Sequence, residues 1–421
     1  MILLLLALQA VVTPSVATGT EKRDIVVLGT SLKDSERDWK ACRKRRCPPD
    51  EEIKVALIHG ENLFVAGDYR KSRAVLSVAI ANTRSAAARF PVDVSDLRRA
   101  EARVASHLGE TDDVRRSMVA SRNALKAGLG TEDERTLAQR LQIGDSMMLE
   151  GTRPISTGPS IFYNDSRIGA LRTYEKVARD AERLDLPEIR GRAMIRIASL
   201  LIALTAGNPS AYETRARAAL RRITDTTDPR LAVFRDTAVL LAAKMDVARG
   251  DPGAVDRLVA SYTGPASDQP VLLYAPPIDW NASRDRMATA AGVAAARGTG
   301  NPDAGHSDEW IDVSFLVRPD GRVEDVEMLR ESGNRRSDWI GPVLQQVAGR
   351  RYAPLKVQAG APGQMRVERH TYTASWGGGT GSRIRRQIGP PRVVILDLTA
   401  EQSASTPIRP TTPEPTAVPR G

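Results

Sequence analysis

The chain has few of the residues that build covalent, metal-based or aromatic frameworks. Its 421 residues include only two cysteines and four histidines. Two cysteines cannot form the disulfide network of a small secreted scaffold, and four scattered histidines leave little for a metal site. Aromatic residues make up only 4% of the chain, which favours helices packed through small side chains over an aromatic-rich β-sandwich. The length predicts two to three domains.

Motifs of the common enzyme classes are also missing. The sequence has no HExxH, no G-x-S-x-G elbow, no Walker motif and no SxxK. The glycine-rich run at Gly377–Gly381 lacks the Lys-Ser/Thr pair of a phosphate-binding loop, so it is interpreted as a linker. We therefore expect no catalytic residues, no cofactor and no metal.

The charge balance is basic but mixed. Lys and Arg number 61 against 51 Asp and Glu, which gives a formal net charge of +10. Acidic residues are interspersed among the arginines, and few aromatic residues are available to stack on bases. This pattern argues against nucleic-acid binding and favours a solvated, charge-laced surface.

The N-terminus carries the one long apolar run, Ile2–Val12. At eleven residues it is too short to span a bilayer, which needs roughly 20. Small residues follow, and the pattern predicts a signal peptide, residues 1–17, cleaved after Ala17. The predicted location is the periplasm. If the true start lies upstream, the same run could instead be retained as a membrane anchor.

Cys42 and Cys47 are then expected to meet in an oxidising compartment. In a continuous helix they would lie about 8 Å apart, beyond the ~7 Å limit for a disulfide. A bridge therefore requires the helix that begins near Ser35 to end before Pro48. The basic run between the cysteines could touch anionic envelope surfaces, although a solvated loop is the simpler interpretation.

After an N-terminal extension over 18–50, the pattern from residue 51 to residue 263 predicts helices separated by Gly and Pro breaks, among them Gly128 and Gly130. The segment Ala56–Tyr69, with Ala74, Val75 and Leu76 beyond it, resembles a tetratricopeptide repeat, in which Gly-Asp-Tyr forms the turn. The resemblance implies an α-helical solenoid. An irregular helical bundle is the alternative interpretation.

Beyond this region the period changes to that of strands. Ile311, Val313, Phe315 and Val317 alternate on one face of a strand over 310–317. Pro319-Asp320-Gly321 supplies a turn, and a bulge is expected near Glu324-Asp325. A helix beginning near Pro342 and a strand over 365–376 follow. The order of these features, with Val313–Glu327, Glu331–Gly333 and Gly349–Pro354, resembles the C-terminal domain of TonB-type proteins.

The predicted fold class is therefore α+β multidomain: a tetratricopeptide-like solenoid followed by a TonB C-terminal-like α+β domain over 268–380, which we expect to fold as a separate unit. Residues 381–421 are expected to contain one strand, at 393–398, and a disordered tail rich in Pro and Thr.

The resemblance implies that the last strand of this sheet receives partner segments at its edge. The corresponding residues are Arg366, Val367, Glu368, Arg369, His370, Thr371 and Tyr372. Nearby arginines, including Arg383, Arg385, Arg386 and Arg392, predict an acidic, extended partner. In the alternative arrangement the chain's own strand at 393–398 already covers this edge.

The predicted function is a non-enzymatic periplasmic scaffold that binds envelope proteins or extended peptide segments. A TonB-type energy-transduction component is the second hypothesis. An enzyme with a site formed between the helices is the third.

Overall fold

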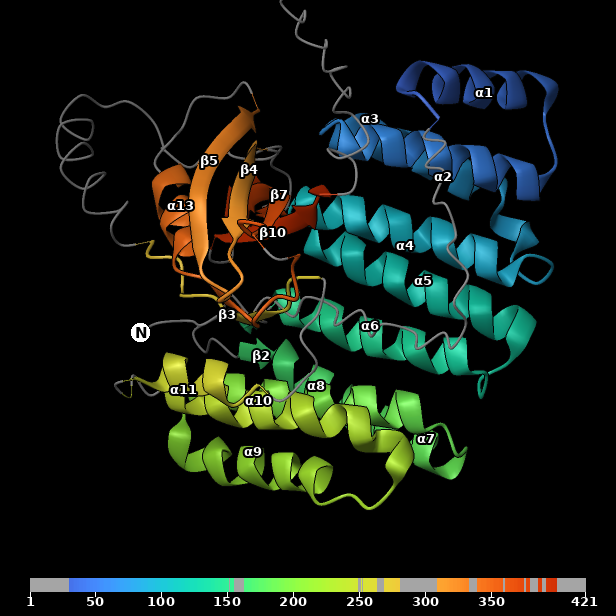
Figure 1. The fold of residues 1–421 in the computed structure, drawn as a ribbon. Helices are drawn as coiled ribbons and strands as arrows, with labels where there is room; N and C mark the ends of the chain where they lie inside the picture. The colour runs from blue at the N-terminus through green and yellow to red at the C-terminus, as the bar shows by residue number, and fades with distance from the viewer. Residues whose placement is uncertain are drawn as a thin grey trace, which may run out of the picture.

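The computed structural model describes residues 30–150, 152–154, 163–248, 251, 253–262, 269–280, 309–332, 339–358, 360–374, 376–378, 385–387 and 391–399. The expected signal peptide and the expected Pro/Thr-rich tail lie outside these residues. Within the described part, no helix is both long and apolar enough to cross a membrane. The molecule is α+β, with stacked helices followed by a small antiparallel sheet (Figure 1).

The helices pack on their neighbours in sequence and form a stack (Figure 1). In chain order they are α1 (Leu32–Arg45), α2 (Pro49–Val65), α3 (Tyr69–Asn82), α4 (Pro91–His107), α5 (Thr111–Leu129), α6 (Glu134–Glu150), α7 (Ser166–Arg183), α8 (Pro187–Thr205), α9 (Pro209–Thr224), α10 (Ala232–Ala248) and α11 (Ala254–Ala260). Proline occupies the first turn of α2, α4, α8 and α9, where its missing N–H costs nothing.

Two boundaries differ from the sequence prediction. Helix α1 lies within the predicted N-terminal extension, yet it packs on α2 through buried Trp39 and so belongs to the helical layer. Helix α5 also continues through Gly128, where a break was expected. Glycine is required at this position by packing, because a Cβ at Gly128 would collide with the Pro91 ring at the start of α4.

The turn between α1 and α2 brings Cys42 and Cys47 within disulfide distance. Arg46 ends α1 in the left-handed region, at φ 54°, and its N–H donates to the carbonyls of Arg43 and Cys42. This reversal brings the Cα atoms of Cys42 and Cys47 to 5.1 Å, and the two residues are bridged. The predicted disulfide is confirmed. The neighbouring Arg45 forms an ion pair with Glu51.

The C-terminal sheet has four strands in the order β10-β7-β4-β5, and every pair is antiparallel. They are β4 (Glu309–Val317), β5 (Val323–Glu331), β7 (Gln364–Thr373) and β10 (Arg392–Asp397). Helix α13 (Ile340–Ala348) starts two residues before the predicted Pro342. Short ribbons complete the structure: β1 (Thr152–Pro154) with β2 (Tyr163–Asp165), β3 (Leu272–Tyr274) with β6 (Arg351–Tyr352), and β8 (Trp376–Gly378) with β9 (Arg385–Gln387).

The β4–β5 hairpin confirms both the predicted turn and the predicted bulge. Gly321 turns at φ 79°, and a Cβ there would strike the carbonyl of Tyr352. Asp325 has φ 51°, and the register shifts between the pairs Leu316–Glu324 and Ser314–Glu327. Asp325 and Val326 of β5 therefore lie opposite the single residue Phe315 of β4, as a bulge requires.

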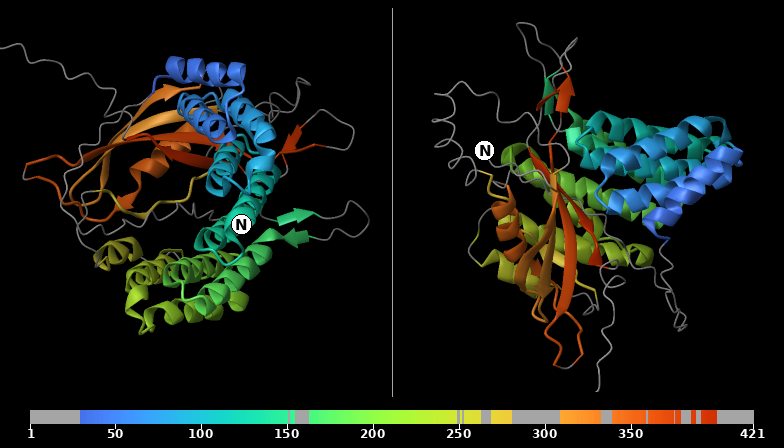
Figure 2. Two further views of the ribbon diagram at one scale, coloured as in Figure 1. Left: turned by 90° about the vertical axis from the view of Figure 1, so that its right-hand side faces the viewer. Right: turned by 90° about the horizontal axis from the view of Figure 1, so that it is seen from above.

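Both faces of the sheet are covered, as Figure 2 shows. On one face, Ile311, Val313, Phe315 and Val317 pack against α13 through Val343 and Val347. On the other face, Trp310 and Leu396 join the core of the first helices. The central strands are consequently buried on both sides, although β4 and β7 carry charged residues. These buried charges mark the candidate site.

Candidate functional site

A buried ion pair lies where the sheet meets the helices. Arg369 of β7 donates from Nε to Asp312 Oδ1 at 2.7 Å and from Nη2 to Asp312 Oδ2 at 3.0 Å. The two residues are opposite each other in the β4–β7 register, and both are fully buried. The Arg369 guanidinium also lies 3.8 Å from the Trp310 ring centroid, a cation–π distance. This bidentate geometry offsets part of the cost of burying two charges.

Arg369 also binds the helical layer directly. Its Nη1 donates to the carbonyl of Val65, the last residue of α2, at 2.6 Å. On the neighbouring strand, Arg392 Nη2 approaches the carbonyl of Ser106 in the last turn of α4, at 3.5 Å. Helix C-termini carry unpaired carbonyls and partial negative charge, which cations stabilise. Two strands of the sheet thus cap the ends of two helices.

The Gly-Asp-Tyr turn between α2 and α3 forms the other half of the contact. The hydroxyl of Tyr69 lies 2.9 Å from Oγ1 of Thr371, and Nδ1 of His107 lies 2.9 Å from the same atom. The aromatic rings of Phe64, Tyr69 and His107 pack together with centroids 4.8–5.3 Å apart. We call this contact, together with Arg369, Asp312 and Arg392, the polar junction.

Burial controls ionisation in the polar junction. Burial, together with the nearby charges of Arg103, Arg369 and Arg392, lowers the pKa of His107 to about 3. Burial also raises the pKa of Tyr69 and lowers that of Arg392 to about 10. At neutral pH the histidine and tyrosine are therefore uncharged, while Arg392 remains a cation.

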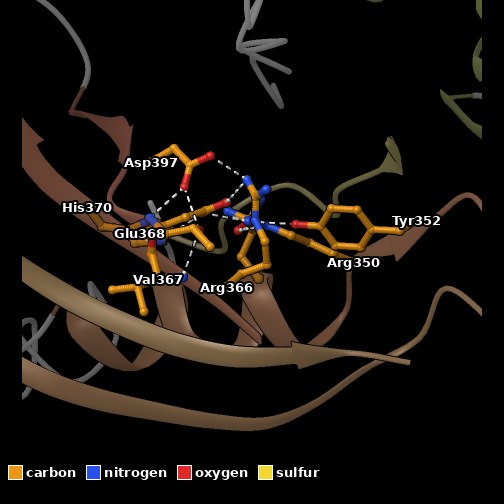
Figure 3. A network of polar contacts seen from close by, with 9 residues as sticks. Arg350, Tyr352, Arg366, Val367, Glu368, His370 and Asp397 are labelled. Atoms are coloured by element: carbon orange, nitrogen blue, oxygen red, sulfur yellow. Dashed lines mark hydrogen bonds and ion pairs between the residues drawn. The ribbon is translucent and has the colours of Figure 1, made fainter. Parts of the chain in front are cut away.

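A second polar network lies on the α13 face of the same strand (Figure 3). Arg350 Nη1 donates to Glu368 Oε2 at 2.7 Å and contacts the Tyr352 hydroxyl at 3.3 Å. Burial opposes the charge of Glu368, but Arg350 and His370 outweigh it and lower the carboxyl pKa to about 2. Arg366 binds Asp397 of β10 at 2.8 Å.

The structure places all seven predicted partner-binding residues inside the sheet. Strand β7 pairs with β4 on one side and with β10 on the other, so it offers no free edge. The contacts of Arg366, Glu368, Arg369 and Thr371 are described above. Of the other three, Val367 donates its N–H to Thr399 Oγ1 at 3.2 Å. His370 contacts Glu368, and Tyr372 packs against Trp280 and Trp339.

The chain's own strand β10 covers the edge of β7. The expectation that a partner segment adds to the strand at Arg366–Tyr372 is therefore wrong. The arginines expected to attract an acidic partner have internal roles. Arg366, Arg369 and Arg392 hold Asp397, Asp312 and the end of α4. The side chains of Arg383, Arg385 and Arg386 lie outside the described residues.

Several residues of these networks were not predicted. Asp312 carried a signal in the sequence, because an Asp in the middle of a buried strand needs a partner charge on the facing strand. Arg350 follows the helix and has no comparable local pattern. Tyr69 and His107 lie 302 and 264 residues from Thr371, a separation that no local pattern spans.

An open groove lies on the helical layer, away from the polar junction. Its volume is about 330 Å³, and it runs between α3, α4 and α5. Val94, Leu97 and Ala124 form a buried apolar floor, and Arg84, Arg98 and Asn123 line it as polar residues. Among the described residues, no group of three or more His, Cys, Asp and Glu side chains could hold a metal ion.

Comparisons with known proteins provide little further guidance. No protein-family model matches the chain, and no curated protein matches it. Among solved structures, the chain is similar to BtubC (BKLC) from P. vanneervenii, with a TM-score of 0.39 and 11% sequence identity. That similarity covers 55% of this chain and 89% of the other. It is too low to support an argument on fold or function.

Proposed function

We propose that the chain is a non-enzymatic scaffold protein of the bacterial periplasm that binds envelope proteins through extended segments. In this proposal the helices form a tetratricopeptide-like array, and the hairpin, α13 and β7 form a TonB C-terminal-like unit. The stacking of consecutive helices supports the first assignment. The order hairpin, helix, strand supports the second.

The observation that carries the proposal is the groove between α3, α4 and α5. In the polar junction and in the network of Arg350 and Glu368, the described charged side chains contact other residues of the chain. The groove, by contrast, is open and lined by exposed Arg84. Arg84 forms no ion pair with any residue in the described part of the chain. Arg98 contributes a second cation, although it contacts Glu101 at 3.5 Å.

This combination fits an extended segment that places an apolar side chain next to an acidic one. The floor would bury the apolar group, and the arginines would bind the carboxylate, because none of the described residues that line the groove is acidic. Charge complementarity of this kind favours acidic partners and disfavours basic ones.

Site-specific photo-crosslinking in the native envelope tests the proposal. A benzophenone amino acid at Asn123, on the groove, should capture one or a few envelope proteins, and the protein should fractionate with the periplasm. The same probe at Arg222, an exposed residue of α9, is the matched control. Arg84→Glu should lower the yield at position 123. A cytoplasmic location, or equal capture from both positions, would contradict the proposal.

A further inference from the structure

The two edge strands of the sheet, β5 and β10, differ in the features that normally prevent an edge strand from pairing with another chain. Strand β5 forms one edge and carries Glu324, Asp325, Glu327 and Glu331. Its register is also interrupted in two places, opposite Asp312–Val313 and opposite Ser314–Leu316. Charges and bulges on an edge strand are the means by which proteins block edge-to-edge pairing. The β5 edge is guarded in this way.

The opposite edge, β10, has none of these features along its centre. Its six residues keep one unbroken register with β7, and no described strand pairs with its other side. The middle four residues are Val393, Val394, Ile395 and Leu396, a run of high β-propensity. All four are half-buried. A regular, apolar, unguarded edge is a surface that pairs readily with another strand.

The ladder shows which backbone groups of β10 face outward. Leu398 N–H donates to the carbonyl of Val367 at 2.8 Å, so this pair is hydrogen-bonded. Hydrogen-bonded pairs recur at every second residue of an antiparallel ladder. The backbone groups of Val394 and Leu396 consequently face β7, and those of Val393, Ile395 and Asp397 point away from it.

We propose that β10 pairs with β10 of a second copy of this chain, so that two four-stranded sheets become one continuous sheet. A twofold axis at Ile395 is the register that pairs all three outward residues, with Ile395 opposite itself and Val393 opposite Asp397 of the partner subunit. An isologous contact of this kind closes on itself and gives a dimer.

Charge does not oppose a second copy at β10, whereas it does oppose one at β5. In the proposed register Arg392 faces Leu398 of the partner subunit, so no like charges lie opposite each other. Pairing two β5 strands would instead bring eight carboxylates together along one ladder, against only the two Arg330 side chains, which already bind Asp312. Like charges across a ladder are destabilising. This surface is separate from the groove of the proposed function, so either proposal can fail without the other.

Light scattering of the full chain at increasing concentration measures the association. We expect a mass twice that of one chain. Ile395→Pro removes one outward N–H from each copy and leaves the β7 pairing intact, because proline is tolerated where the N–H of an edge strand faces outward. The loss of two hydrogen bonds should weaken the dimer about 30-fold. Ile395→Val, which keeps the N–H, is the matched control and should change the affinity only a few-fold.

Cysteine cross-linking tests the register and does not depend on the proline variant folding. The native cysteines are bridged to each other, so an introduced cysteine is the sole free thiol. Oxidation should cross-link Ile395→Cys between copies, because paired Cα atoms lie about 5.5 Å apart. Val393→Cys should not cross-link, because the two copies of that residue lie roughly 14 Å apart.

Three results would overturn the proposal. They are a monomeric mass at every concentration, a dimer that Ile395→Pro leaves unchanged, and cross-linking of Val393→Cys in place of Ile395→Cys. Capture of an unrelated protein's segment at Ile395 by a monomeric chain would likewise assign the edge to a different occupant.

Discussion

At the scale of single residues, the structure depends on charges that are buried in pairs. Arg369 and Asp312 are both fully buried, and Arg369 also binds the carbonyl of Val65. Removing one partner of such a pair leaves an uncompensated charge, whereas replacing both with apolar side chains is often close to neutral. The pair therefore contributes more to specific docking of the two layers than to net stability.

We expect Arg369→Met to lower the free energy of unfolding by about 3–5 kcal/mol, since buried Asp312 loses its bidentate partner and keeps only the ion pair with exposed Arg330. The double variant Arg369→Met with Asp312→Leu should recover much of this loss. The exposed ion pair of Arg318 with Glu324 is the control, because Arg318→Ala should cost less than about 1 kcal/mol. Urea unfolding measures all three variants. Additive losses in the double variant would disagree with this account.

His107 should make stability depend on pH. Its pKa is about 3 in the folded chain and about 6.5 when unfolded, so the unfolded chain binds a proton that the folded chain excludes. The stabilisation is complete above pH 6.5 and declines as the pH falls toward 3, by up to about 1.4 kcal/mol per pH unit. Between pH 7 and pH 5, wild type should lose about 2 kcal/mol more than His107→Asn. Parallel stability curves for the two proteins would rule out this role.

At the scale of elements, α1 is held to the helical layer by Trp39 and by the Cys42–Cys47 bridge. Replacing both cysteines with alanine should cost about 2 kcal/mol, the value expected for so small a loop. Thiol reagents should not label the native protein without a reductant, and reduced wild type should match the double variant in urea unfolding. Rapid labelling of both cysteines in the native protein would show that the bridge is absent.

The elements that sequence could predict are those determined by local pattern. The alternation from Ile311 to Val317 predicted β4, and the change of face between Val323 and the pair Val326 and Met328 predicted the bulge in β5. The break expected at Gly130 agrees with the end of α5, whereas Gly128 lies inside the helix, where it allows close packing against Pro91. The polar junction was missed because Thr371 meets Tyr69 and His107 only after the two layers dock.

At the scale of the whole molecule, the sheet depends on residues outside the predicted 268–380 unit. Strand β10 lies beyond its end, and the helices cover the face that carries Arg369 and Asp312. The sequence predicts that this fragment folds by itself. With the structure known, we expect a fragment over 268–380 to lack a cooperative thermal transition, because one edge and one charged face would be exposed.

The fragment over 269–399 restores β10 and is the matched comparison. It should gain helical and strand signal in circular dichroism but remain less stable than the full chain. We expect the full chain to unfold in one transition in which sheet and helices are lost together. A sharp melt of the 268–380 fragment would instead restore the view of the sheet as an independent domain.

The position of β10 near the end of the chain also sets the order of events during folding. The helices make contacts between neighbours in sequence, and such local contacts form early and fast. The sheet cannot be completed until residue 397 has left the ribosome, because β10 pairs with β7 and Asp397 of β10 binds Arg366. Until then, the turn at Tyr69 and the C-terminal ends of α2 and α4 are folded but not covered by the sheet. A chain truncated before β10 would leave these surfaces exposed permanently.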